Sequence, residues 1–323
     1  MKVVLSRKGF DSDYGGKPSP IFQDGTMVSV PIPVRKPCAF DPTIGQLEFQ
    51  GFNLGQLMVT LGASRSDGSG GRVKLTLASR VHRDPDIYPE FSGQPGGWKA
   101  PFGQTGAAQS HLANQHVDVG DLFLFFGLFR RLEQGGTNAC RYKPDASNVH
   151  VIFGWLQVGE VIKLNSTRGQ VDECARQRLT HRIPYLAQHP HVAPGSERYT
   201  NNVLYIADDK LNIPDEDCAG LPGAGAFRHF DHSLQLTSPD DGKLTRWRLP
   251  TWFFPVGSEH ALTYHRAPER WNKRDDFTFL DAAGRGQEFV LDTAYYPDAK
   301  SWVANLIRQE SRCRQSDFRK LDR

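Results

Sequence analysis

Hydrophobic residues gather in two long runs near the middle of this chain. Residues 122–129 are apolar and rich in phenylalanine, and residues 149–164 form a second apolar run that contains two glycines. Apolar runs that end at turn residues are typical of buried β-strands. The polar segment between them, residues 134–148, is rich in turn formers, which predicts a long hairpin loop. We therefore expect an antiparallel, mostly buried pair of strands at the centre of the fold.

Shorter patterns on either side of this pair predict further elements. Apolar residues at 2–5 and 203–207 predict two short strands. Residues 171–188 carry apolar positions at helical spacing, and Pro184 should end or kink that helix. Residues 302–307 predict another helix. Strands therefore outnumber helices in the predicted fold.

Composition supports one soluble domain. The 323 residues are 38% hydrophobic and 23% charged, which is typical of a globular protein with a core. The 31 glycines and 21 prolines favour many short strands and loops. Because no low-complexity linker divides the chain, we expect residues 1–307 to form one integrated α+β domain with a central curved sheet or barrel flanked by short helices. Residues 308–323 form a basic tail that we expect to be solvated and frayed.

The charge, the cysteines and the termini set the expected compartment and partners. A net charge of +3 is compatible with a nucleic-acid partner but does not require one. The five cysteines show no CxxC pair, so we expect neither a zinc ribbon nor a disulfide, and reduced thiols favour the cytoplasm. The first apolar run is too short for a signal peptide, and no run is long enough to span a membrane.

A polar, glycine-rich loop follows the first predicted strand. Strand-to-loop junctions of this kind are common anion or nucleotide sites, although the spacing of a Walker loop is absent. The alternative is a rigid surface loop whose charges are solvated, and the sequence leaves both open. The candidate ligand-binding residues in this loop are Ser6, Arg7, Lys8, Asp11 and Ser12.

A second polar segment contains His82, Asp84 and Asp86 around a proline. A histidine and a carboxylate at this spacing can act as acid and base, or can contribute to a metal site if further ligands come from elsewhere. The alternative is an Asp-Pro turn in which the carboxylate bonds the local backbone, and we assign Asp86 to such a turn. His189 and His191 flank another proline and would point to one side if the segment is extended, but no third ligand is evident.

Several stretches of the chain are distinctive as a set: VLSRKGFDSDYGGKPSPI, HRDPD, FGQTGAAQSHL, VGDLFLFFGLFR, VIFGWLQVGEVI, LPTWFFP, LTYHRAPERW and GRGQEFVLD. The set resembles the third family of nucleotide modification associated domains, over residues 2–302. This resemblance implies a link to DNA or nucleotide modification, with a nucleotide or DNA and proteins of a modification system as partners, and it assigns no catalytic residue and no cofactor.

The central strand pair is also similar to the corresponding strands of PUA, ASCH and EVE barrels, which bind RNA or modified bases. That similarity implies a PUA-like curved sheet or barrel. Two function classes follow and stay open. One is an enzyme that acts on a nucleotide or a base in DNA, and the other is a non-catalytic module that binds a modified base or serves as a scaffold. No GxSxG or strand-following GxGxxG motif occurs, so the reaction type is not set.

In the enzyme hypothesis, polar loops held by glycine or proline should meet in one pocket. Their polar groups would be costly to bury without a partner or a ligand. The loops are residues 6–12, 82–84, 104–111 and 285–288. We assign catalysis to His82, Asp84 and Glu288, and ligand binding also to Gln104, Gln109, His111, Arg266 and Arg285. No metal ligand set is assigned.

Overall fold

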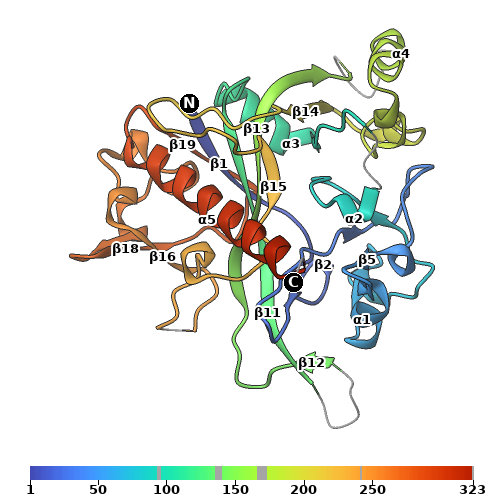
Figure 1. The fold of residues 1–323 in the computed structure, drawn as a ribbon, viewed down its shortest axis with the longest axis horizontal. Coiled ribbons are helices and arrows are strands. Elements are labelled where there is room, and N and C mark those ends of the chain that lie inside the picture. The colour runs from blue at the N-terminus through green and yellow to red at the C-terminus, as the bar shows by residue number, and fades with distance from the viewer. Residues whose placement is uncertain (93–95, 135–139, 166–172, 241, 322–323) are drawn as a thin grey trace.

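The computed structural model describes residues 1–92, 96–134, 140–165, 173–240 and 242–321. Its main element is a nine-stranded mixed sheet (Figure 1). The strands of this sheet are β1 (Lys2–Arg7), β3 (Ser19–Ile21), β10 (Pro101–Gln104), β11 (Leu122–Gln134), β12 (Cys140–Tyr142), β13 (Val149–Lys163), β14 (Val203–Ala207), β15 (Ala224–Ala226) and β19 (Glu288–Asp292).

Small ribbons and five α-helices complete the described part of the chain. The ribbons are β16 (Arg246–Pro250) with β17 (Trp271–Lys273) and β18 (Phe277–Asp281), β2 (Tyr14–Gly15) with β7 (Ser64–Ser66) and β8 (Arg72–Lys74), β4 (Ile32–Pro33) with β9 (Val81–His82), and β5 (Glu48–Phe49) with β6 (Phe52–Asn53). The helices are α1 (Leu54–Thr60), α2 (Pro89–Ser92), α3 (Gly106–Asn114), α4 (Glu173–Arg182) and α5 (Asp298–Leu321).

The predicted central strand pair is confirmed. β11 and β13 pair antiparallel from Leu122 opposite Gln157 to Phe129 opposite Val149. Their side chains are buried on both faces of the sheet, which explains why the sequence shows unbroken apolar runs rather than alternation. On one face, the rings of Phe123 and Phe125 stack with centroids 6.1 Å apart. Aromatic packing therefore fixes the centre of the sheet.

The mixed α+β class is confirmed, whereas the sheet does not close into a barrel within the described residues. Its strands run in the order β10, β14, β13, β11, β1, β19, with β10 pairing to β14 and β19 pairing to β1. A barrel requires the two edge strands to pair with each other. Here β10 and β19 lie at opposite ends of the path, so the sheet is open.

The C-terminal segment differs from the expected frayed tail, because α5 continues from Asp298 to Leu321. Val303, Ala304 and Ile307 are buried on its inner face, and α5 crosses one face of the sheet (Figure 1). Glu310, also buried, accepts a hydrogen bond from the backbone N–H of Arg228. The apolar stripe lies in the segment that was predicted to be helical, and the Glu310 contact lies on the continuation of the same helix into the basic segment that composition assigned to solvent.

The predicted helix over 171–188 is shorter in the structure. α4 covers Glu173–Arg182, and residues 171–172 lie outside the described residues. A 3-10 turn, Pro184–Gln188, then replaces the α-helix at the expected proline. All five cysteines lie within the described residues, and none of them forms a disulfide. None of the described helices combines the length and apolar character needed to cross a membrane.

The topology brings the ends of remote strands together. β1 ends at Arg7 and β19 begins at Glu288, and Ser6 lies opposite Glu288 in this antiparallel pair. β10 ends at Gln104, whose amide bonds the carboxylate of Glu288. Polar side chains that are far apart in the sequence therefore meet where the ends of these strands come together.

Candidate functional site

A cavity of about 300 Å³ opens where these strand ends meet. All four loops named by the sequence analysis contribute at least one residue to its wall. The lining residues are Arg7, Lys8, Gly9, Asp11, Tyr14, Ile32, Val34, His82, Asp84, Gly103, Gln104, Thr105, His191, Tyr199 and Gln287.

His82 and Asp84 lie on one side of this cavity. β9 pairs with β4, so that His82 is opposite Ile32 and is buried. The two ring nitrogens of His82 lie between carboxylates: Nδ1 is 3.9 Å from Oδ1 of Asp41, and Nε2 is 3.8 Å from Oδ2 of Asp84. Oδ1 of Asp84 accepts a hydrogen bond of 2.8 Å from the backbone N–H of Gly103. This bond ties Asp84 to the remote strand β10 rather than to a local turn.

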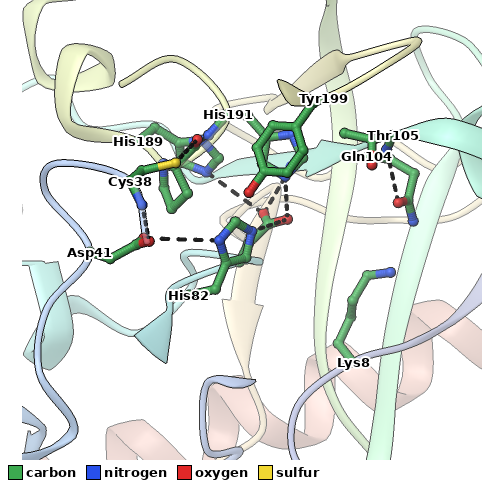
Figure 2. Close-up of polar contacts among 12 residues, drawn as sticks. Lys8, Cys38, Asp41, His82, Gln104, Thr105, His189, His191 and Tyr199 are labelled. Carbon is green, nitrogen blue, oxygen red and sulfur yellow. Dashed lines mark hydrogen bonds and ion pairs between the residues drawn. The ribbon is translucent and has the colours of Figure 1, made fainter. Parts of the chain in front are cut away.

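Two further histidines surround the same carboxylate (Figure 2). They follow the 3-10 turn that Pro184 begins. Nε2 of His189 lies 3.7 Å from Oδ1 of Asp84, and Nε2 of His191 lies 3.3 Å from Oδ2. The ring of Tyr199 stacks on that of His191, with centroids 4.9 Å apart. One buried carboxylate therefore has three imidazole neighbours, and both histidines of the His-Pro-His pair face it.

Burial and charge act against each other in this cluster. Burial alone would raise the pKa of Asp84, but the interactions with His189, His191 and His82 outweigh it and hold that pKa well below its usual range. Burial lowers the pKa of His189 to about 4, although the neighbouring carboxylate opposes this. At neutral pH the cluster therefore holds a charged Asp84 and a neutral His189.

A second polar cluster lies on the other side of the cavity. Oε1 of Glu288 accepts hydrogen bonds of 2.8 Å from Nζ of Lys8 and 2.5 Å from Nε2 of Gln104. Glu288 is only 1% exposed, whereas Lys8 and Gln104 line the cavity. Glu288 thus reaches the cavity through these two side chains. Oε2 of Glu288 and Oγ of Ser6 are buried and have no hydrogen-bond partner among the described residues.

The loop after β1 contributes cationic and acidic groups with local partners. The guanidinium of Arg7 donates to the backbone carbonyls of residues 283 and 284, at 3.2 and 3.0 Å, and burial lowers its pKa. Oδ1 of Asp11 accepts a hydrogen bond of 2.6 Å from the backbone N–H of Tyr14, as a turn-forming aspartate does. Burial raises the pKa of Asp11.

The remaining sequence-assigned residues do not line this cavity in the described part of the chain. Tyr205 donates a hydrogen bond of 3.0 Å to Oε1 of the buried Gln109. Nε2 of His111 lies 3.1 Å from the hydroxyl of Thr263. The exposed residues among them are Ser12, Arg266 and Arg285. The sequence-assigned residues outside the cavity wall are Ser6, Ser12, Gln109, His111, Arg266, Arg285 and Glu288.

Sequence reasoning missed the residues that complete the histidine cluster. Asp41 is remote from the HRDPD segment in sequence and carried no motif. Asn202, 2% exposed, contacts Nδ1 of His191 at 2.7 Å through its Oδ1. Gly103 leaves room for that histidine, because a Cβ at this position would lie 2.2 Å from Cγ of His191. The His-Pro-His spacing was the one available signal, and its partner Asp84 became evident only in the fold.

Comparison with known sequences places the chain in a family. No curated protein and no solved structure matches it. The sequence model of one family, described as nucleotide modification associated domain 3, matches residues 2–292 of the 323 residues. The matched range includes every residue that lines the cavity. The chain therefore belongs to the nucleotide modification associated domain 3 family.

Proposed function

We propose that this protein is an enzyme of nucleotide modification and that its substrate, a nucleotide or a base of DNA, enters the cavity described above. The single observation that carries the proposal is the composition of the cavity wall. One wall joins an ammonium group, an amide and a carboxylate surrounded by histidines, although these groups come from distant parts of the chain. Membership of a nucleotide modification associated family supports the substrate class.

The two sides of the cavity suit different parts of a nucleotide. Lys8 and Arg7 supply positive charge for a phosphate, with Lys8 the more available because Arg7 already bonds two carbonyls. Gln104 offers an amide to a base edge. His82 and Asp84 face the reactive part of the substrate, where a histidine and a carboxylate can transfer a proton. Glu288 positions Lys8 and Gln104 from behind.

A second candidate function is non-catalytic recognition of a modified base, as in the PUA-like interpretation of the sequence. The observation that favours it is aromatic: Tyr14, 48% exposed, and Tyr199 both line the cavity. Aromatic side chains on a cavity wall can stack on a base without any reaction.

Removing the charge from the Lys8–Glu288 pair tests the proposed substrate class. In the double variant Lys8→Gln/Glu288→Gln, each position keeps a hydrogen-bonding amide, but the ammonium and carboxylate charges are both lost. We expect the affinity for deoxynucleoside monophosphates, measured by calorimetry, to fall about 10- to 100-fold, because a hydrogen bond to a charged group contributes about 1.5–3 kcal/mol. A phosphate-free nucleoside should lose much less.

The matched control is Lys300→Gln/Asp215→Asn, which neutralises another pair at 2.8 Å that does not border the cavity. Equal losses in both double variants, or no nucleotide binding by the wild-type protein, would reject the proposal. Mass spectrometry of nucleotide and DNA after incubation separates the two candidates. Binding without any change in substrate mass favours the recognition module, whereas a product that disappears in Asp84→Asn favours the enzyme.

A further inference from the structure

Three side chains of the cavity wall converge at the spacing of a metal coordination sphere. Nε2 of His82 and Nε2 of His191 lie 3.8 and 3.3 Å from the same atom, Oδ2 of Asp84. One ligand atom from each residue lies within 4.8 Å of the other two. Two ligands that are each about 2.1 Å from a tetrahedral zinc ion are about 3.4 Å apart. The space between these atoms therefore has the dimensions of one bound metal ion.

The hydrogen bonds around His191 fix which nitrogen can bind a metal. Nδ2 of Asn202 donates to the backbone carbonyl of His191 at 2.9 Å, which leaves Oδ1 of Asn202 as the acceptor that faces Nδ1 of His191 at 2.7 Å. Nδ1 must then carry a proton. In the neutral ring the lone pair is on Nε2, which faces a carboxylate oxygen of Asp84 at 3.3 Å. Two acceptors that face each other in a buried site need a proton or a metal ion between them.

His82 has a carboxylate, that of Asp41, in the corresponding position, but at 3.9 Å it lies beyond hydrogen-bond distance. Asp41 is 1% exposed, and its Oδ2 accepts a hydrogen bond of 2.7 Å from the backbone N–H of Cys38. Its Oδ1 points to Nδ1 of His82 at 3.9 Å, and neither atom has a hydrogen-bond partner among the described residues. A carboxylate behind a histidine in this way orients the other ring nitrogen toward a metal. Here that nitrogen is Nε2, which faces Oδ2 of Asp84.

His189 belongs to the surrounding shell and is not a ligand. Its Nδ1 accepts a hydrogen bond of 3.3 Å from the backbone N–H of His191, so its proton is on Nε2 in the neutral ring. That Nε2 faces Oδ1 of Asp84, the oxygen that also accepts from the N–H of Gly103. Both donors therefore act on Oδ1, and Oδ2 stays available for a cation.

From this geometry we infer that His82, Asp84 and His191 bind one divalent first-row transition metal ion through Nε2, Oδ2 and Nε2. Two imidazoles and one carboxylate suit zinc or iron, whereas magnesium and calcium prefer an all-oxygen set. All three ligands line the cavity, so the remaining coordination positions face the space that the proposed substrate enters. The metal would supply a Lewis acid or an activated water there, and with His82 and Asp84 as ligands that water would take over the proton transfer proposed for these two side chains. This inference rests on the side-chain geometry and holds with or without a nucleotide substrate.

Metal content tests the inference directly. The full chain is purified without chelators, stripped, and loaded separately with Zn²⁺, Fe²⁺, Co²⁺ or Mg²⁺, and bound metal is measured by plasma mass spectrometry. We expect one Zn²⁺, Fe²⁺ or Co²⁺ per chain, visible d–d absorption from bound Co²⁺, and no retained Mg²⁺. Competition between Zn²⁺ and Fe²⁺ identifies which of these two metals the site prefers. His191→Gln and Asp84→Asn each remove a ligand and should weaken metal binding by more than about 100-fold. Asn202→Leu removes a residue that only supports a ligand, and it should weaken binding by about 10- to 100-fold.

The control is His265→Gln, because His265 is equally buried but both of its ring nitrogens bond backbone groups, at 2.8 and 2.9 Å. This variant should lose stability and keep the metal, which separates ligand loss from unfolding; circular dichroism monitors the fold of every variant. The inference is overturned if the wild-type protein retains no transition metal, if Mg²⁺ binds as well as Zn²⁺ and Fe²⁺, or if folded His191→Gln and Asp84→Asn bind metal as the wild type does. Because no nucleotide is present, this result is independent of the nucleotide-binding test.

Discussion

Two buried polar clusters border the cavity, and they are built differently. Lys8, Gln104 and Glu288 are joined by hydrogen bonds of 2.5 and 2.8 Å. Asp84 has histidine contacts of 3.3–3.8 Å, all longer than an ordinary N–H···O bond. The first cluster pairs its charges within the protein. Each cluster contains a buried polar atom without a hydrogen-bond partner in the described residues, Oε2 of Glu288 in the first and Nδ1 of His82 in the second. The second cluster differs because none of its three histidines lies close enough to Asp84 to form a short ion pair.

This difference separates groups that stabilise the fold from groups that can bind a ligand. A buried ion pair with short hydrogen bonds compensates its own loss of hydration. The side chains around Asp84 converge without short contacts, and the distances of 3.8 and 3.3 Å from its Oδ2 to Nε2 of His82 and Nε2 of His191 leave room for a cation. The two clusters therefore have different roles: the lysine cluster shapes and charges the cavity, and the histidine cluster binds a cation.

The largest expected effect comes from breaking the lysine cluster, which consists of Lys8, Gln104 and Glu288. Lys8→Met leaves Glu288 as an unpaired buried carboxylate, which should lower the free energy of unfolding by about 3–5 kcal/mol. The double variant Lys8→Met/Glu288→Met should recover most of this loss, because it removes both charges. Denaturant titration of both variants measures the difference. A loss below about 1 kcal/mol in the single variant would show that the pair is not a closed structural unit.

The next effect distinguishes the histidine cluster around Asp84 from the lysine cluster. Zinc at about 100 times its dissociation constant should stabilise the wild-type protein by about 2.7 kcal/mol, since it binds the folded state. The Lys8→Met/Glu288→Met variant should gain the same amount, and His191→Gln should gain nothing. Thermal unfolding with and without zinc provides the measurement, and an equal gain in His191→Gln would place the metal elsewhere.

A single added methyl group should disturb the histidine cluster and leave the lysine cluster intact. In Gly103→Ala the new Cβ would lie 2.2 Å from Cγ of His191, so the ring must move. We expect a cost of about 1–3 kcal/mol in stability together with weaker metal binding. Gly284→Ala is the control, because nothing lies within 4 Å of a Cβ there and its φ is not positive. If metal affinity is unchanged in Gly103→Ala, the position of His191 is not critical.

The smallest effect concerns buried histidines outside both clusters. Burial lowers the pKa of His265 to about 4 and that of His150 to about 3, from an ordinary value of 6.5. Unfolding lets these rings take up protons, so stability should be full above pH 6.5 and fall as the pH drops toward 4, by about 1.4 kcal/mol per pH unit and histidine. His265→Gln should reduce that slope when denaturant titrations are compared across this range. An unchanged slope would show that His265 protonates freely in the folded state.

The elements that depend on local pattern could be predicted from the sequence. The apolar runs that became β11 and β13 need no distant information, because strands buried on both faces lack polar positions. The frayed tail was predicted from charge, whereas α5 continues to Leu321 and the buried Glu310 accepts a hydrogen bond from the backbone N–H of Arg228. The barrel expectation failed for a similar reason, since pairing of edge strands is decided by the whole sheet.

The candidate site was predictable only in part. His82, Asp84 and the loop after β1 stand out because polar groups cluster beside glycine or proline. The sequence could not show that His191 reaches Asp84, because β10 and the turn after Pro184 must first bring them together. Asp41 and Asn202 were also out of reach, since a lone aspartate or asparagine carries no pattern until its partner is known.

The most direct measurement of the central claim is anomalous X-ray diffraction from crystals grown with zinc, recorded on both sides of the zinc absorption edge. We predict one strong peak per chain, about 2.1 Å from Nε2 of His82, Nε2 of His191 and Oδ2 of Asp84. Asn202 and Asp41 should hold the opposite ring nitrogens of the two histidines. No peak between these three atoms, with well-ordered side chains and zinc in excess, would contradict the claim that the histidine cluster is a metal site.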